Sequence, residues 1–146
     1  MIKFALVSDA PKGTKLPARK TRCSMGYDFF LPCDVELKPG ESTGIIPLNI
    51  KAYMPDDIGL ELHIRSSVGL LKHVKLANGV GLIDADYVDN PDNEGNIGIV
   101  LENWGAQDVS FKKGDRICQG VFRKYYTVDD DAANGERTGG TGSTGV

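Results

Sequence analysis

The chain has 146 residues, of which 40% are hydrophobic and 25% charged, and its formal net charge is −3. This length suits one domain and not two, and the composition is that of an ordinary globular protein. The negative charge argues against a sequence-blind nucleic-acid binder, and no apolar run is long enough to span a membrane.

The N-terminal part carries a basic cluster at residues 12–22, in which Pro, Thr and Gly separate the lysines and arginines. This pattern predicts a solvated arm. Residues 1–9 lack the layout of a secretory signal. The three cysteines (Cys23, Cys33 and Cys118) form no Cys-x-x-Cys pair, which predicts reduced, mostly buried thiols and a cytoplasmic protein.

Short strands separated by turns are predicted for most of the chain, from alternating apolar and polar residues bounded by Gly and Pro. The predicted strands, with their closing turns, lie at 35–40, 43–54, 59–64, 97–101, 109–111 and 117–126. Between them, Ser66 to His73 predicts one or two helical turns with a serine as N-cap. Many short strands indicate an all-β sandwich or barrel-like roll.

The composition changes at Asp129, where three aspartates lead into a stretch of Gly, Ser and Thr. Such a segment cannot bury enough apolar surface to become ordered by itself. The sequence therefore predicts a β domain over residues 1–128 and a flexible C-terminal arm over residues 129–146.

Five short segments combine glycine with polar and charged residues: SMGYD at 24–28, RSSVG at 65–69, NGVGLIDADY at 78–87, GDRICQ at 114–119 and RTGGTGSTG at 137–145. Each alone has a plain structural explanation as a turn, a strand end or a tail. In this order they resemble the five motifs of the trimeric dUTPase family. The resemblance implies a jelly-roll-like β fold, a homotrimer, and Mg²⁺-dependent hydrolysis of dUTP to dUMP and pyrophosphate.

The resemblance also implies active sites shared between subunits. The first, second and fourth motifs form one wall, the third comes from a neighbour, and the fifth is a lid on the arm of the remaining subunit. A glycine-rich lid suits this role because its backbone N–H groups can approach phosphate oxygens closely. Ordering the lid costs entropy, so a highly charged ligand is needed to hold it.

The general base implied by the resemblance is Asp84. An ionised carboxylate can accept a proton from a water held in line with the leaving pyrophosphate. Ser66 is implied to lie near the α–β bridging oxygen, and Gln119 to orient the attacking water or an α-phosphate oxygen. Asp86 is expected to have a supporting role, and Arg116 a structural one.

Base and sugar recognition is implied for the third motif. Tyr87 would stack beneath the deoxyribose and leave no room for a 2′-hydroxyl, which rejects UTP by shape. Asn78, with backbone groups around Gly81, would read the uracil edge, since an amide offers both a donor and an acceptor. Cytosine presents the reversed pattern and would leave polar groups unpaired, at a cost of ~1–3 kcal/mol each.

The phosphates and the metal are implied to be held by the remaining motifs. Arg65 would contact phosphate, with Ser67 as an alternative donor to Ser66, and Arg137 would clamp the γ-phosphate as a planar fork. Asp28 would hold Mg²⁺ through its water shell, since this ion keeps several waters and needs few carboxylates. The lid itself is predicted to use Gly140, Thr141, Gly142, Ser143 and Thr144.

Two features depart from the family pattern. Thr141 stands where an aromatic residue usually caps the uracil, so stacking is either lost or supplied by Phe29, Phe30 or Trp104. Residues 88–94 form a polar loop where many relatives turn tightly. This loop is either a harmless insertion or a surface that contacts the nucleotide mouth or a regulatory protein partner.

Two other functions fit parts of the sequence. A dCTP deaminase shares the fold, but its attack on the base ring does not need the glycine-rich tail. A nucleotide-sensing regulatory protein would keep the pocket and bind a partner through the 88–94 loop. The complete fifth motif, together with Asp84 and Tyr87, favours a phosphate hydrolase whose partners are dUTP and its own copies, without nucleic acid or membrane.

Overall fold

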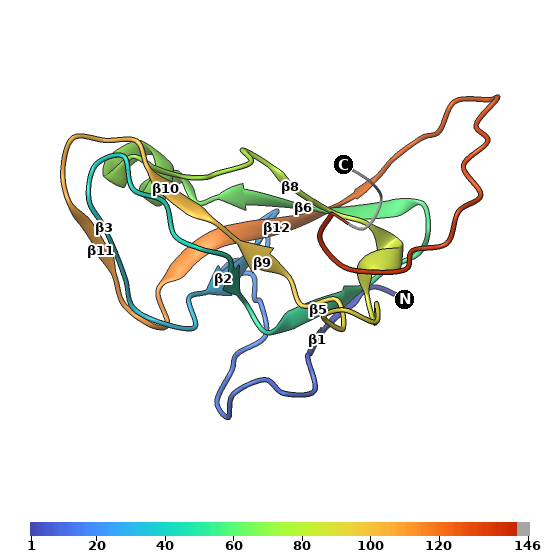
Figure 1. Ribbon diagram of the computed structural model, residues 1–146, viewed down its shortest axis with the longest axis horizontal. Helices are drawn as coiled ribbons and strands as arrows, with labels where there is room; N and C mark the ends of the chain where they lie inside the picture. Colours follow the sequence, from blue (N-terminus) through green and yellow to red (C-terminus); the bar gives the residue numbers. More distant parts are fainter. Residues whose placement is uncertain (143–146) are drawn as a thin grey trace.

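Strands make up the regular structure of residues 1–142, the part of the chain that the computed structural model describes (Figure 1). The largest sheet is antiparallel and has four strands in the order β2-β12-β6-β8. Its strands are β2 (Tyr27–Phe30), β12 (Arg116–Lys124), β6 (Ile58–Ile64) and β8 (Gly81–Ile83).

Four antiparallel pairs complete the β structure of the described residues. They are β1 (Lys3–Leu6) with β5 (Ile50–Tyr53), β11 (Val109–Phe111) with β3 (Val35–Leu37), β4 (Ile46–Pro47) with β9 (Gly98–Ile99), and β10 (Leu101–Asn103) with β7 (Val74–Leu76). Apolar side chains from these pairs and from the large sheet form one core cluster. The fold is the all-β, jelly-roll-like fold that the sequence predicted.

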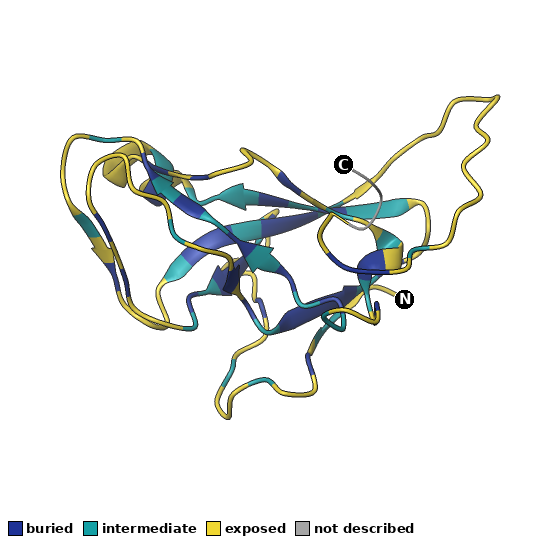
Figure 2. Ribbon diagram, viewed as in Figure 1, coloured by how far each residue is buried: buried dark blue, intermediate teal, exposed yellow. Residues whose placement is uncertain are grey.

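The core follows from the alternation that marks a strand with one buried face (Figure 2). On β6, Leu60 and Leu62 are buried, whereas their neighbours are only half-buried. Both leucines lie opposite β12 residues in the sheet register, where Gly120 pairs with Leu62. The long strands β6 and β12 therefore form the rigid centre to which the site loops are attached.

Two helical turns interrupt the strands: the π-type turn η1 (Ser67–Leu71) and the 3-10 turn η2 (Ala85–Tyr87). A helix was predicted at the first of these positions, but the predicted serine cap is wrong. Ser66 has helical backbone angles (φ −55°, ψ −43°) and makes no capping hydrogen bond with its side chain. A capping residue needs a non-helical backbone, so the hydroxyl of Ser66 is not used for that purpose.

The prediction of mostly buried thiols is correct for one cysteine and wrong for two. Cys118 is buried on β12, whereas Cys23 and Cys33 are exposed, and all three are free. Both exposed cysteines lie in turns, where no strand face buries a side chain. Among the described residues, no helix is long and apolar enough to cross a membrane.

The C-terminal arm leaves the domain after β12 and then returns to it (Figure 1). Residues 123–136 are exposed, as their polar composition predicts, and residues 129–142 contain no helix or strand. The chain is buried again at Gly139 and Gly140. The described part of the arm is therefore docked on the β domain by its far end.

Candidate active site

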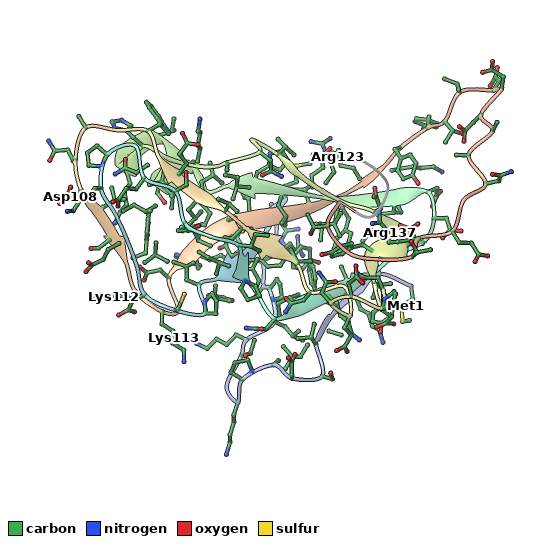
Figure 3. All side chains as sticks on the ribbon, viewed as in Figure 1. Met1, Asp108, Lys112, Lys113, Arg123 and Arg137 are labelled. Atoms are coloured by element: carbon green, nitrogen blue, oxygen red, sulfur yellow. The ribbon has the colours of Figure 1, made fainter. Side chains whose placement is uncertain are left out.

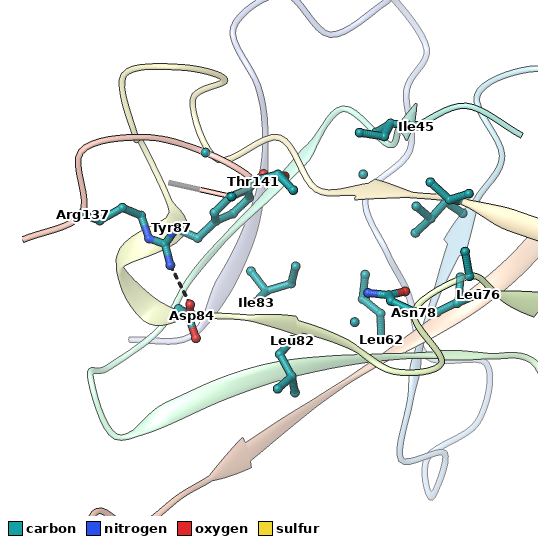
Figure 4. A pocket seen from close by; sticks show the side chains of 17 residues that line it. Ile45, Leu62, Leu76, Asn78, Leu82, Ile83, Asp84, Tyr87, Arg137 and Thr141 are labelled. Carbon is teal, nitrogen blue, oxygen red and sulfur yellow. Dashed lines mark hydrogen bonds and ion pairs between the residues drawn. The ribbon is translucent and has the colours of Figure 1, made fainter. Parts of the chain in front are cut away.

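A cavity of about 400 Å³ lies between the segment from β7 to β8, the β9–β10 segment and the end of the arm (Figure 4). Apolar side chains such as Leu62, Leu76 and Ile83 line its inner part. Eight predicted site residues line it as well: Asn78, Gly81, Asp84, Tyr87, Arg137, Gly140, Thr141 and Gly142. The third motif and the described part of the fifth thus meet in one pocket.

Local backbone geometry places the residues of the third motif. Gly79 has φ +76°, which allows the tight turn that carries Asn78 between β7 and β8. Gly81 lies against Leu62, where an added Cβ would come within 3.3 Å of that side chain. Asp84 then ends β8 in an extended conformation before η2, so its carboxylate stays exposed at the pocket.

Arg137 bridges two carboxylates at the mouth of this pocket. Its Nη2 lies 2.6 Å from Asp84 Oδ2, and its Nε lies 2.8 Å from Asp86 Oδ1. The hydrogen bond to Asp86 and the charges of both carboxylates raise the pKa of Arg137 above its ordinary value. The guanidinium also lies 5.5 Å from the centre of the Tyr87 ring, which favours its docking further.

In the described chain the arm lies over the pocket of its own chain, where Arg137 pairs with the two exposed carboxylates of the third motif (Figure 4). The family resemblance implied an arm from another subunit, and that arrangement stays a prediction. Ser143 and Thr144, which were also assigned to the lid, lie outside the described residues.

A second set of predicted residues gathers at the ends of β2, β6 and β12. Asp28 is 8% exposed, and its two oxygens lie 3.1 Å from Arg65 Nε and 3.2 Å from Arg116 Nη1. Gln119 lies directly opposite Asp28 in the strand register. Gly26 leaves space for this amide, since a Cβ there would come within 2.5 Å of Gln119 Oε1. Arg116 thus pairs with a carboxylate on the neighbouring strand β2, a contact compatible with the structural role expected for it.

The two sets lie at opposite ends of β6 within one chain. Arg65 follows the last residue of this strand, and the register of β8 sets Asp84 beside Gly59 at its beginning. Six residues of strand separate these positions, which corresponds to roughly 20 Å at about 3.3 Å per residue. In Figure 1 the helical turns η1 and η2, which follow these positions in the sequence, lie toward opposite ends of the molecule. Ser66 and Ser67 are exposed beside Arg65 and do not line the pocket.

None of the three proposed substitutes for the missing aromatic lines this pocket in the described chain. Phe29 is 1% exposed in the core, and Trp104 packs on His73 with ring centroids 4.7 Å apart. Phe30 faces another depression, together with lysines of the N-terminal segment. Within this chain none of the three is placed to stack on a base in this pocket, because Phe29 is buried in the core, Phe30 faces the other depression and Trp104 packs on His73.

The loop at residues 88–94 is held against the β domain and the arm by ion pairs and hydrogen bonds, and it is not a free, solvated insertion. Lys51 is 9% exposed and forms ion pairs with Asp89 at 2.5 Å and with Glu94 at 2.7 Å. Asn90 is buried, and Asp92 accepts a hydrogen bond from the arm. The alternative in which the loop contacts the nucleotide mouth is thus the one that the contacts support. Sequence reasoning missed Lys51 because its partners lie far along the chain.

The fit of Mg²⁺ depends on Asp28. Among residues 1–142, no group of three or more His, Cys, Asp or Glu side chains could hold a metal ion directly. Both oxygens of Asp28 are already paired with guanidinium groups, but a carboxylate has about four acceptor positions. The remaining positions fit contact with Mg²⁺ that keeps its water shell, since this ion holds several waters and needs few carboxylates.

Comparisons with known proteins agree with this geometry. The dUTPase family model matches residues 12–145. The deoxyuridine 5′-triphosphate nucleotidohydrolase of Lactococcus lactis is 42% identical over 136 residues, which cover 92% of this chain and 90% of that protein. The crystal structure of the Streptococcus mutans dUTPase has a TM-score of 0.78 at 37% identity and covers 86% of this chain and 98% of its own. A dUTPase from phage phi11 of S. aureus, described with a structural Mg(II) ion, shares the fold at a TM-score of 0.73 and 21% identity, covering 92% of this chain and 97% of its own.

These similarities, together with the fold, define the class of protein, an all-β hydrolase of nucleotides. The chain belongs to the dUTPase family. Its activity is that of a deoxyuridine 5′-triphosphate nucleotidohydrolase, a dUTP diphosphatase.

Proposed function

We propose that this dUTPase cleaves dUTP to dUMP and pyrophosphate by in-line attack of water on the α-phosphorus, with Asp84 as general base. The observation that carries this mechanism is the exposed carboxylate of Asp84 at the edge of the pocket, next to a cationic group. A carboxylate there can take the proton of the attacking water while the pocket holds the nucleoside. Gln119 would orient the water or an α-phosphate oxygen.

The nucleoside would occupy the pocket of the third motif. The Asn78 amide would pair with the uracil edge, and backbone groups near Gly81 would complete the reading. Tyr87, buried at one side of the pocket, would lie under the deoxyribose and exclude a 2′-hydroxyl. Gly140, Thr141 and Gly142 would close over the nucleotide with Ser143 and Thr144.

Arg137 has to exchange partners when the nucleotide binds. In the described state its guanidinium is bonded to Asp84 and Asp86. The γ-phosphate carries a charge similar to that of the two carboxylates together and accepts the same planar fork, so it would compete with them for Arg137. This exchange would free Asp84 to contact the attacking water and would couple closure of the lid to activation of the base.

The distance between the two residue sets supports an assembly of identical chains, and the dUTPase family to which the chain belongs favours a homotrimer. Ser66 and Asp84 are both assigned to the α-phosphate, yet within one chain they lie at opposite ends of β6. Neither side chain can bridge roughly 20 Å of strand. A neighbouring copy must therefore bring Arg65, Ser66 or Ser67, Gln119 and Asp28 to the pocket of this chain. Symmetric association of identical chains supplies such a shared site.

Mg²⁺ would bind the triphosphate with Asp28 contacting its water shell, and it would neutralise charge on the phosphate oxygens. Arg65 would contact the same phosphates from beside Asp28. The physiological role that we propose is to limit uracil in DNA and to supply dUMP for dTMP synthesis, in the cytoplasm.

Turnover of an Asp84→Asn variant tests the mechanism. We expect pyrophosphate release from dUTP to fall by about 10³-fold or more, because an amide cannot accept the proton, while nucleotide binding is retained. Asp108→Asn, an exposed acid at the other end of the molecule, is the control and should be fully active (Figure 3). Unchanged turnover in Asp84→Asn would remove this residue from the mechanism.

The same assay separates the other two functions. Wild-type enzyme should release pyrophosphate from dUTP in preference to dCTP, dTTP and UTP, and this activity should depend on Mg²⁺. Release of ammonia from dCTP would instead indicate a deaminase. Binding of dUTP without turnover would indicate a nucleotide sensor that works through a partner at the 88–94 loop.

A further inference from the structure

The 88–94 loop is held in one shape by its own asparagines. The Oδ1 atom of Asn90 accepts the backbone N–H groups of Asp92 and Asn93, and its Nδ2 donates to the carbonyl of Tyr87 at 2.7 Å. Gly95 closes the loop with φ +80°, where a Cβ would lie 2.7 Å from Val88 Cα. A loop closed this tightly behaves as a rigid unit.

Lys51 fixes this unit to the β domain. Its ammonium group, on β5, pairs with Asp89 at one end of the loop and with Glu94 at the other. Glu94 also accepts hydrogen bonds from the backbone and hydroxyl of Ser8. Both ends of the loop are therefore anchored, so the residues between them have fixed positions relative to the pocket.

Asn93 directs its amide at the hydroxyl group of Tyr87. Its Nδ2 donates to that hydroxyl at 2.7 Å, and its Oδ1 accepts from Asn90 Nδ2 and from the N–H of Gly95. These partners set the orientation of the amide. The Tyr87 hydroxyl in turn donates to the carbonyl of Asn96 at 3.2 Å. The Tyr87 ring, which borders the pocket, is thus fixed through its hydroxyl group.

Asp92 holds the arm on the other side of the same loop. Its Oδ2 accepts the backbone N–H of Gly140 at 2.8 Å, which is a charge-assisted hydrogen bond. Gly140 is buried against Asn93, where an added Cβ would come within 3.1 Å of Nδ2. The loop therefore contacts both the ring beneath the nucleotide and the glycine that closes over it.

We propose that the 88–94 loop is a positioning element of the nucleotide site, in which Asn93 fixes the ring of Tyr87 and Asp92 latches the arm through Gly140. The loop thereby contributes to discrimination between dUTP and UTP and to closure of the lid. This inference rests on the roles proposed above for Tyr87 and for the arm. It assigns Asn93 and Asp92 as residues that act through others and do not touch the reacting atoms.

Sugar selectivity tests the role of Asn93. In Asn93→Ala, the Tyr87 ring loses its donor, so the kcat/KM ratio of dUTP over UTP should fall by about fivefold, the size of a modest shape effect. Tyr53→Phe is the matched control, because it removes a hydroxyl that bonds Asp89 in the same loop without touching Tyr87 or the arm, and its ratio should stay at the wild-type value.

A double variant makes this test specific. In a Tyr87→Phe background the hydroxyl that Asn93 holds is absent, so adding Asn93→Ala should change the ratio no further. An equal loss of kcat/KM for dUTP and UTP in Asn93→Ala would mean a general loss of structure and would overturn the positioning role. Thermal unfolding of each variant shows whether the fold is intact.

Trypsin cleavage after Arg137 tests the latch without any nucleotide. The Arg137 side chain is only 9% exposed in the docked arm, so cleavage requires the arm to open. In Asp92→Ala, release of the 138–146 peptide should be about tenfold to a hundredfold faster, as expected for one lost hydrogen bond to a charged group. Asp108→Ala should release it at the wild-type rate, and an unchanged rate in Asp92→Ala would overturn the latch.

The two tests are independent of the catalytic proposal. If Asp84→Asn kept full turnover, the mechanism would fail while the cleavage rates still reported on the latch. If Asp92→Ala cleaved at the wild-type rate while Asp84→Asn was inactive, the latch alone would fail.

Discussion

Glu94 shows how single residues of the loop control the stability of the domain. Its hydrogen bonds with Lys51 and Ser8 lower its pKa from the ordinary value of 4.5 to about 2. Folding therefore favours the ionised form. The stability from these contacts is fully present above the ordinary pKa and is lost as the pH falls through about 2.

Replacing Glu94 with Gln should make the protein less stable at pH 7 and flatten the pH dependence of its stability between about 4.5 and 2. Denaturant unfolding at a series of pH values measures this slope. Glu36→Gln, an exposed position on β3, is the control and should retain the wild-type slope. A wild-type slope in Glu94→Gln would contradict the role of the Lys51 contacts.

Contacts of this kind are invisible to local sequence patterns. Lys51 occupies a strand position at which a charged residue predicts exposure, yet it is buried because its partners come from a loop about forty residues later. The polar composition of residues 88–94 predicted solvent contact for the same reason. Composition reports the polarity of a segment, whereas burial depends on whether a complementary charge is within reach.

At the scale of elements, the sequence predicted the long strands well and the short ones poorly. The alternation around Leu60 and Leu62 is visible because β6 spans seven residues with one face buried. Strands β1, β2 and β7 have three or four residues each and were not predicted, because so short a segment shows no full alternation. The predicted ranges 43–54 and 97–101 did include the two-residue strands β4 and β9, but no local window shows that these two pair with each other.

At Gly120, strand β12 lies directly against side chains of the core. An added Cβ would lie 2.8 Å from Phe29 Cε2 and 3.0 Å from Leu60 Cδ1, both in the core. Gly120→Ala should therefore lower the free energy of unfolding by ~1–3 kcal/mol through overpacking. Urea unfolding at pH 7 measures this loss.

Gly44 provides the matched control for that substitution. An added Cβ there meets nothing within 4 Å, and its φ lies outside the left-handed region. Gly44→Ala should leave the stability within about 0.5 kcal/mol of wild type or raise it slightly. Equal effects of the two alanines would mean that the contact at Gly120 is relieved by small shifts of Phe29.

At the scale of the whole molecule, the motifs identified the residues of the site but not their grouping. Asn78, Asp84 and Tyr87 share a pocket because β8 and η2 are continuous in sequence. Arg65 lies elsewhere because β6 and β8 are antiparallel. Asp84 follows the end of β8 and so lies near the beginning of β6, whereas Arg65 follows the end of β6. The docking of Arg137 was equally hidden, since it depends on the spatial proximity of Asp84 and Asp86.

A site divided in this way predicts complementation between two inactive variants. Asp84→Asn changes a residue that lines the pocket, and Arg65→Ala changes a residue of the group around Asp28. Each homotrimer should therefore have little activity. In trimers refolded from an equal mixture, a site is intact when the chain that supplies the pocket has Asp84 and the neighbouring chain that supplies the group around Asp28 has Arg65. Random assembly gives this combination at about a quarter of the sites, so about a quarter of the wild-type turnover should return.

Recovery has to depend on exchange of subunits. The two variants mixed as folded proteins, without unfolding, should remain inactive until their chains exchange, whereas co-refolded protein should be active at once. Size-exclusion chromatography shows that both samples have the same assembly. Because Asp84 and Arg65 are roughly 20 Å apart along β6, a single chain cannot place both on one α-phosphate. Failure to recover turnover after co-refolding would therefore contradict the division of the site between chains.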